Sequence, residues 1–176
     1  MRATGDQSAL IPTQTGSRLG VCDVLVRALS KSVVDIAYGV PDSVLVSVLD
    51  ALASQMPTII LPREDLAVAA ALGAYLRGHR PLVFMKNAGL GNALDALLSL
   101  AMASRMPLVV LIGWAGSGPD TLPHHTVWGD RTRAALGLFS DEILSIDEST
   151  EESHFVKRIN RAFEQNAITS ILVMPT

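Results

Sequence analysis

The chain has 176 residues, enough for one domain with a buried core, and 49% of them are hydrophobic whereas only 5% are aromatic. The net charge is −3 and the Lys and Arg residues are scattered, which excludes the basic surface typical of a nucleic-acid-binding protein. The mean hydropathy is high at +0.35, but no apolar run reaches the roughly 18 residues of a membrane span, so we expect no contact with a membrane.

The first 17 residues are polar and lack the apolar segment of a secretory signal. We expect them to form a flexible tail before a single domain at 18–176. Cys22, the one cysteine, follows in a helical pattern. A single thiol makes no disulfide framework and no cysteine-based metal site, and we therefore expect a protein of the reducing cytoplasm.

Short apolar stretches bounded by glycine, proline or polar residues predict the strands. Some of them, such as 108–114, are continuously apolar, as expected of strands that are buried on both faces. In chain order, the predicted strands are 33–40, 58–61, 81–85, 108–114, 142–146 and 168–174.

Between these strands, apolar residues recur at helical spacing. Asp42 or Ser43 can cap the first of these helices, and Ser149 with Glu152 has the spacing of a capping box for the last. Five helices are predicted. The first begins after Asp42, the next three span about 64–77, 90–105 and 127–138, and the inner face of the last runs from Phe155 to Phe163.

Alternating strands and helices predict an α/β fold in three layers: a mainly parallel sheet of about six strands with helices on both faces, in a flavodoxin-like layout. Ligands of such sheets bind beyond the carboxyl ends of the strands, beside a switch in strand order. The loops to consider are therefore 39–43, 62–65, 86–92 and 114–129, which contain the unusual polar residues of the chain.

Glu64 lies where a predicted strand gives way to a helix, so its side chain can point into a ligand cleft. The same position favours acidic residues for a simpler reason, because they face the positive end of the helix dipole. Position alone therefore does not separate a catalytic carboxylate from an ordinary residue of a first helical turn.

The stretch from Lys86 to Asn92 contains Gly89 and Gly91, which allow a tight turn and a close approach of the backbone to a ligand. It is not a dinucleotide-binding fingerprint, because Leu94 stands where the third glycine belongs. It is not a Walker loop either, since no Gly-Lys-Ser/Thr follows. A plain turn from strand to helix remains the simpler alternative.

His124 and His125 are neighbours in a predicted glycine-rich loop. Adjacent histidines rarely chelate one ion, and no Cys, Asp or Glu stands at ligand spacing, so we predict no metal site. Proton transfer to a bound substrate and an ordinary surface loop are both open interpretations. Covalent catalysis by a protein side chain is not expected, because the chain has no Gly-x-Ser-x-Gly elbow.

Together, these loops resemble the pyrimidine-binding domain of thiamine diphosphate-dependent 2-oxo acid decarboxylases, in the branch of the phosphonopyruvate and sulfopyruvate decarboxylases. The resemblance extends over about 33–133, and its Asn-x-Gly-Leu-Gly-Asn stretch is the most specific part. The stretches that carry it are Gly39-Val40-Pro41, Glu64 with Ala67-Val68-Ala69, residues 87–93, and Pro123-His124-His125 with Gly129.

The resemblance implies that Glu64 hydrogen-bonds the aminopyrimidine ring of thiamine diphosphate and thereby activates the cofactor. It also implies that His125 protonates the reaction intermediate or holds the anionic tail of the substrate. The residues implied in cofactor binding are Glu64, Pro41, Asn87, Gly89, Gly91 and Asn92, and the candidates for substrate binding are Asp42, Ser43, Lys86, His124 and His125, with Arg105, Arg131 and Arg133 as further candidates.

Two positions depart from the family pattern: Lys86 replaces a usually neutral residue, and Asp42 replaces a small residue or a cysteine. The second domain of these enzymes, which binds the diphosphate and Mg²⁺ and carries Gly-Asp-Gly, has no match, since this chain has Gly129-Asp130-Arg131. The resemblance therefore implies an α subunit that needs a separate β subunit to hold Mg²⁺, in an α2β2 or larger assembly.

The leading hypothesis is the pyrimidine-binding subunit of a decarboxylase that converts phosphonopyruvate into phosphonoacetaldehyde and CO2. His125 favours phosphonopyruvate over sulfopyruvate, because the sulfopyruvate enzymes lack this histidine. The alternatives are a sulfopyruvate decarboxylase α subunit, a subunit of another thiamine-dependent carboligase, a non-catalytic scaffold subunit, and a flavodoxin-like domain that converged on glycine-rich loops.

Overall fold

The computed structural model describes residues 20–146 and 150–175, and within them six strands form a single sheet. The strands are β1 (Ile36–Gly39), β2 (Thr58–Ile60), β3 (Pro81–Lys86), β4 (Leu108–Gly113), β5 (Glu142–Ser145) and β6 (Ile168–Val173). All neighbours are parallel, in the order β2-β1-β3-β4-β6-β5. The predicted parallel sheet of about six strands is confirmed.

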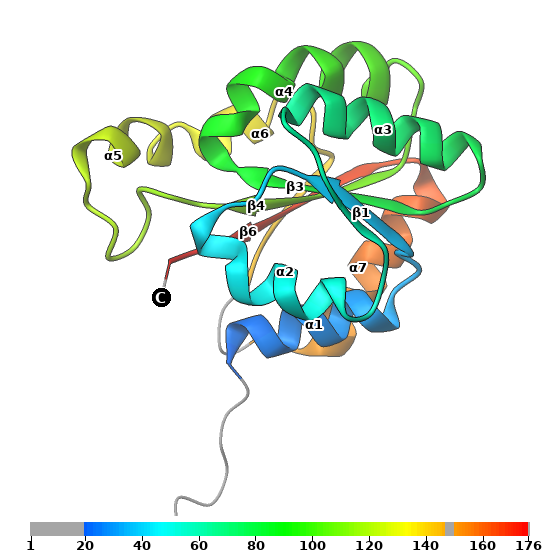
Figure 1. Ribbon diagram of the computed structural model, residues 1–176, viewed down its shortest axis with the longest axis horizontal. Coiled ribbons are helices and arrows are strands. Elements are labelled where there is room, and N and C mark those ends of the chain that lie inside the picture. The colour runs from blue at the N-terminus through cyan, green and yellow to red at the C-terminus, as the bar shows by residue number, and fades with distance from the viewer. Residues whose placement is uncertain (1–19, 147–149, 176) are drawn as a thin grey trace, which may run out of the picture.

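Helices cover both faces of this sheet and give the three predicted layers (Figure 1). One face carries α1 (Val21–Lys31), α2 (Val46–Ala53) and α7 (Glu152–Gln165), and the other carries α3 (Glu64–Leu76) and α4 (Leu90–Ala96) with its π-helical continuation Leu97–Met102. The shorter helical elements are the 3-10 turns Ser43–Leu45 and Asn87–Gly89 and the helices α5 (Pro123–Gly129) and α6 (Thr132–Leu136). None of the described helices combines the length and the hydropathy that crossing a membrane requires.

Aliphatic side chains fill the space between the sheet and each helical layer. β4 is buried along its whole length, and successive side chains of this strand point to opposite faces. Leu111 lies in the core cluster shared with α1, α2 and α7, whereas Val110 lies in the cluster shared with α3 and α4. The aliphatic composition of the chain therefore supplies two cores, one for each face.

The prediction of one helix over 127–138 is wrong. The structure has two short helices, α5 and α6, and His124 and His125 belong to the first turn of α5 rather than to a loop. Pro123 explains the early start, because proline lacks an N–H group and its fixed φ suits the first helical position. Figure 1 shows α5 standing out at the end of the molecule where the C-terminus also lies.

The last helix begins at Glu152, after the N-cap residue Glu151. The predicted capping box cannot be compared with it, because Ser149 lies outside the described residues, as does the predicted tail at 1–17. Cys22, predicted to be helical, lies in α1.

The sheet contains the switch in strand order that was expected to mark a ligand site. From β1 the chain passes to β2 at one edge, and it then returns to β3 on the other side of β1. The segments after β1 and β3 lead to α2 and α4, which cover opposite faces. Asp42 in the first of these segments and Lys86, the last residue of β3, therefore lie near each other at the carboxyl ends of the strands, where open α/β sheets bind ligands.

Replacement of Leu111 by alanine is expected to lower the free energy of unfolding by about 3 kcal/mol, because it leaves a cavity in a fully buried central strand. Leu76→Ala is the matched control, since Leu76 is 75% exposed and its truncation leaves no cavity. Urea denaturation of both variants measures the difference. Equal stabilities would contradict the assignment of β4 to the core.

Candidate functional site

Glu64 is the first residue of α3, and its carboxylate contacts the loop that follows β3. Its Oε2 accepts a hydrogen bond of 3.0 Å from the Nδ2 of Asn92, whereas Oε1 accepts none from the described residues. A Cβ at Gly89 would come within 2.6 Å of Oε1, so only glycine permits this close approach. Two predicted cofactor-binding segments are thus in direct contact.

Asn87 is fully buried, and its side chain connects three segments of the chain. Its Nδ2 donates hydrogen bonds of 2.8 Å to the backbone oxygen of Ala115, after β4, and to Oγ1 of Thr132 in α6. Oγ1 of Thr132 in turn donates to the backbone oxygen of Trp128 at 2.7 Å. Because these contacts use both amide protons, Asn87 holds the loops together, and its contact with a cofactor stays a prediction.

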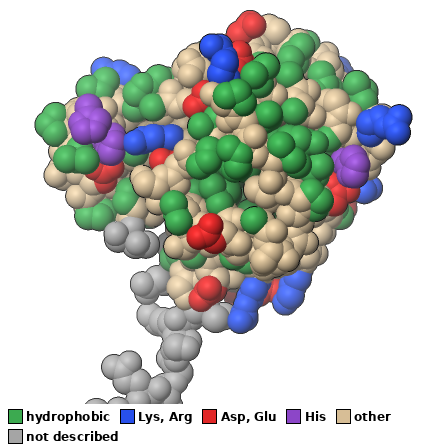
Figure 2. Space-filling model, in the orientation of Figure 1, with side chains coloured by type: hydrophobic (Ala, Val, Ile, Leu, Met, Phe, Trp, Pro, Cys, Tyr) green, Lys and Arg blue, Asp and Glu red, His purple; other side chains and the backbone are tan. Residues whose placement is uncertain are grey.

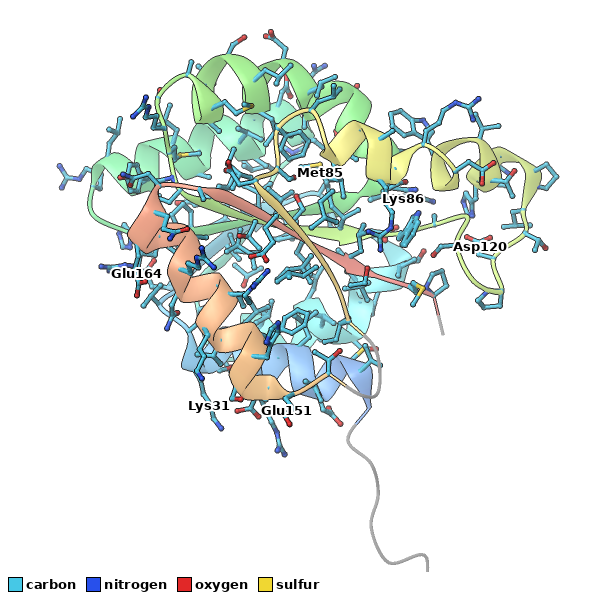
Figure 3. All side chains as sticks on the ribbon, turned by 180° about the vertical axis from the view of Figure 1, so that it is seen from behind. Lys31, Met85, Lys86, Asp120, Glu151 and Glu164 are labelled. Atoms are coloured by element: carbon cyan, nitrogen blue, oxygen red, sulfur yellow. The ribbon has the colours of Figure 1, made fainter. Side chains whose placement is uncertain are left out.

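His125 lies between two charged side chains. Its Nδ1 is 2.7 Å from Oδ2 of Asp120, and its Nε2 is 2.9 Å from Nζ of Lys86, the last residue of β3. His125 and Asp120 are largely buried, with side-chain exposures of 19% and 14%. Figure 3 shows Lys86 and Asp120 at the same end of the molecule. The structure therefore forms a Lys86–His125–Asp120 triad at the carboxyl ends of the strands.

The backbone around Gly116 fixes the Asp120 end of this triad. The N–H of Gly116 donates a 2.9 Å hydrogen bond to Oδ2 of Asp120, and this bond, together with those from His125 and from the N–H of Leu122, lowers the pKa of the Asp120 carboxyl. Gly116 has φ = +76°, and a Cβ there would lie 2.3 Å from the backbone oxygen of His125. Glycine is therefore required for the loop to hold both His125 and Asp120.

Asp42 lies beside the triad and is only 6% exposed. Its Oδ2 accepts a hydrogen bond of 3.2 Å from the N–H of Val44 and occupies the space where a side chain of Gly113 would be. Gly113 pairs in register with Lys86, so Asp42 faces the end of β3. Burial raises the pKa of Asp42, while the charge of Lys86 and the hydrogen bond from the N–H of Val44 oppose this increase.

Of the other predicted residues, some lie at a cavity and others are exposed at the surface. Ser43 and His125 line a cavity of about 320 Å³ at this end of the sheet, and Pro41 stands two residues before Ser43 in the chain. Its remaining lining residues are Cys22, Val44, Ser47, Ala115, Asp120, Leu122, Met174 and Pro175. His124 is exposed, and its ring stacks edge-on against that of His125 with centroids 4.3 Å apart. Gly91 is also exposed, close to the ring of Trp128.

Arg105 lies just before β4, at the amino ends of the strands and at the opposite end of the sheet from the triad, so the structure does not bring it together with the other candidates. Arg131 donates a hydrogen bond to the backbone oxygen of Val127. Arg133 stacks over the ring of Trp114 and donates to Ser145. Both of these arginines are engaged in contacts that stabilise α5 and α6, and neither contacts the triad.

Sequence reasoning missed Asp120 and Thr132. The spacing of Asp120 five residues before His125 was a usable signal, since a turn before a helix can bring such a pair together. Thr132 gave no signal, because its partner Asn87 is 45 residues away in the sequence.

Comparisons with known proteins identify the family of the chain. Residues 20–127 match the family model of the thiamine pyrophosphate enzyme N-terminal TPP binding domain. The phosphonopyruvate decarboxylase of Streptomyces viridochromogenes is 32% identical over 139 residues, which cover 77% of this chain and 35% of the relative. The sulfopyruvate decarboxylase of Methanosarcina acetivorans is 30% identical over 92 residues, covering 52% and 24%. The sulfopyruvate decarboxylase subunit alpha of Methanocaldococcus jannaschii is 30% identical over 124 residues, covering 69% of each chain.

The parallel α/β sheet with helices on both faces is thus that of a thiamine pyrophosphate enzyme N-terminal domain. The chain belongs to this family, in the branch that contains the phosphonopyruvate and sulfopyruvate decarboxylases. It spans only 35% and 24% of the length of the first two relatives, but 69% of the α subunit.

Asp42→Asn is expected to stabilise the isolated chain at neutral pH by on the order of 1 kcal/mol. Burial raises the pKa of Asp42, so the folded state favours the protonated carboxyl, and the wild type loses stability as the pH rises from the ordinary carboxyl pKa through the raised one. Asparagine is neutral throughout and still caps the N–H of Val44. Urea denaturation at neutral pH and at about pH 3 measures the difference, which should disappear in acid; a difference independent of pH would contradict this account.

Proposed function

We propose that this chain is the pyrimidine-binding subunit of a thiamine diphosphate-dependent decarboxylase that acts on a small anionic 2-oxo acid, with phosphonopyruvate as the substrate. The position of Glu64 is the observation that carries the proposal. Its Oε1 accepts no hydrogen bond from the part of the chain that the structure describes, while Oε2 is held by Asn92 and the carboxylate rests on Gly89. A carboxylate oriented in this way suits a pyrimidine ring nitrogen, which needs a partner that can share a proton with it.

When bound, thiamine diphosphate supplies a carbon nucleophile for the 2-oxo group and accepts the electron pair that CO2 leaves behind. The chain's own residues would contribute three further actions. Glu64 would share a proton with the ring through Oε1, the 86–92 loop would position the ring, and the triad would supply a proton to the product. Mg²⁺ and the diphosphate would be held by the partner.

A separate partner subunit is supported by the relatives that are named as α subunits. Large apolar side chains also stand exposed near the carboxyl ends of the strands: Val46, Ile60, Leu66, Leu122 and Val127 are 46–56% exposed. Figure 2 shows hydrophobic side chains gathered in the middle of the face that it presents. We propose that a β subunit covers this end of the sheet and that the assembly contains at least two copies of each chain.

Sulfopyruvate is a second candidate substrate, and one observation favours it. The relative whose length this chain covers best among those compared above is a sulfopyruvate decarboxylase subunit alpha. Both substrates place a second anion beside the 2-oxo acid, so Lys86 would suit either of them.

The proposed function includes a location in the cytoplasm.

Glu64→Gln tests the function directly. The chain is assembled with a candidate β subunit, thiamine diphosphate and Mg²⁺, and CO2 release from phosphonopyruvate and sulfopyruvate is measured. We expect Glu64→Gln to lower kcat about 100-fold or more, because an amide cannot exchange a proton with the ring.

Asp65→Asn is the matched control, since Asp65 is the neighbouring acid of the same helical turn and pairs with Arg63. It should retain the wild-type rate. A wild-type rate in Glu64→Gln would refute the role of Glu64, and an assembly that decarboxylates neither acid would favour a scaffold subunit.

Gly89→Ala tests the contact between the loop and Glu64. The new Cβ would meet Oε1 and Cγ of Glu64 at 2.6 and 2.7 Å, so the carboxylate has to move. We expect the assembled complex to bind thiamine diphosphate at least about tenfold more weakly by calorimetry, with the fold retained. Gly73→Ala, an exposed site of α3 with no atom within 4 Å of the added Cβ, should bind normally and be more stable by about 0.5–1 kcal/mol. Equal binding by the two variants would contradict the proposed contact.

A further inference from the structure

Both ring nitrogens of His125 are already engaged within the protein. Nδ1 contacts Oδ2 of Asp120 at 2.7 Å, and Nε2 contacts Nζ of Lys86 at 2.9 Å. A substrate that approached His125 would therefore find no free N–H on the ring unless Lys86 moved away. The role of proton donor, which the family resemblance implies for His125, is not the role that this arrangement suits best.

The chemistry of the partners fixes the order of the protons in the triad. Asp120, whose pKa is lowered, is a carboxylate and only accepts, so Nδ1 of His125 carries a hydrogen. An ammonium group only donates, so Nε2 presents its lone pair to Lys86. The imidazole is then neutral, and the charges of Lys86 and Asp120 balance.

We propose that Lys86, rather than His125, is the catalytic acid that protonates the substrate carbon from which CO2 has departed, and that His125 and Asp120 are positioning residues for Lys86. This inference rests on the proposed function. Proton donation is thereby assigned to Lys86, a position at which the sequence is expected to depart from the family pattern.

The position of Lys86 supports this role. It is the last residue of β3, at the switch in strand order, and it is only partly buried. One of its three N–H bonds is directed at Nε2 of His125, which leaves two for a bound substrate. Asp42 faces the same strand end from the loop after β1, since its Oδ2 lies against Gly113, which pairs in register with Lys86. The charged or titratable groups around Nζ are thus Asp42, His125 and, beyond the imidazole, Asp120.

The step balances in protons and electrons. The electron pair that CO2 leaves behind, which the bound cofactor would hold, would form the new C–H bond with a proton from Nζ. The pair of the broken N–H bond would stay on Nζ as the lone pair of a neutral amine. A proton from water then restores the ammonium before the next turnover. No oxidant or reductant is required.

Two simpler roles for Lys86 predict different behaviour. If it only orients His125, or only attracts the anionic tail of the substrate, an arginine should replace it well, because guanidinium is a cation and a hydrogen-bond donor. Arginine cannot give up its proton in a protein, however. Lys86→Arg therefore separates the donor role from both alternatives.

The kinetic part of the experiment compares Lys86→Arg and Lys86→Met in the assembled complex. We expect Lys86→Arg to lower kcat about 100-fold with KM changed by less than about threefold, and Lys86→Met to lower kcat similarly and also to raise KM. Lys157→Arg, an exposed lysine of α7, is the matched control and should behave as the wild type. A kcat of Lys86→Arg within about threefold of the wild type would overturn the proposal.

The second readout needs neither cofactor nor activity. Nitrogen-15 NMR of the full chain labelled at histidine should show His125 in the Nδ1–H form at neutral pH, unchanged in Lys86→Arg and mixed with the Nε2–H form in Lys86→Met. An Nε2–H form in the wild type would overturn the proton order on which the role of Lys86 rests. A complex that releases no CO2 from either acid would instead count against the proposed function, and the NMR result would still decide the arrangement of the triad.

Discussion

The buried amide of Asn87 is the contact on which the geometry of this site depends. It follows Lys86 at the end of β3, and its two donated hydrogen bonds tie that strand end to the segment after β4 and to α6. Loss of these partners would leave a buried amide unsatisfied and lower the free energy of unfolding by about 1–3 kcal/mol. The three segments are therefore held in one arrangement. Lys86 and Gly89, on either side of Asn87 in the sequence, are fixed by the same contact. Glu64 meets Gly89 on the α3 side, and His125 meets Lys86 on the α5 side.

Three glycines make this arrangement possible by the space that they leave. A Cβ at Gly89 would displace Glu64, one at Gly113 would overlap Asp42, and one at Gly116 would overlap the backbone of His125. Each of these residues stands after a strand or at its end, where the neighbouring loops converge. The charged side chains of the site therefore approach the backbone more closely than any larger residue would allow. The glycines at these three positions therefore leave the space that Glu64, Asp42 and the backbone of His125 occupy.

Most of the fold was predictable because it follows from short-range patterns. Apolar stretches predicted all six strands to within a few residues, and the alternation with helices predicted the parallel sheet. The resemblance implied that Glu64 and the glycine-rich loop bind the same cofactor, whereas position alone left the role of Glu64 ambiguous. Asp120 and Thr132 were missed because their roles come from contacts made only after folding. The start of α5 was missed for a local reason, as the glycines before Pro123 suggested a longer loop.

The two positions at which the sequence is expected to depart from its family pattern gain a physical explanation when they are considered together. Asp42 and Lys86 are 44 positions apart in the sequence, yet they lie on adjoining strand ends, and the charge of Lys86 opposes the rise in the pKa of Asp42. A buried acid in this place without a nearby cation would be more costly, and a lysine here without acids would carry an unbalanced charge into a half-buried site. Asp120 supplies the second balancing charge through His125. The cluster therefore tolerates a cation at the end of β3 because it has two carboxylates to compensate for it. This compensation keeps an ammonium group at the carboxyl ends of the strands, where we propose that the substrate reacts.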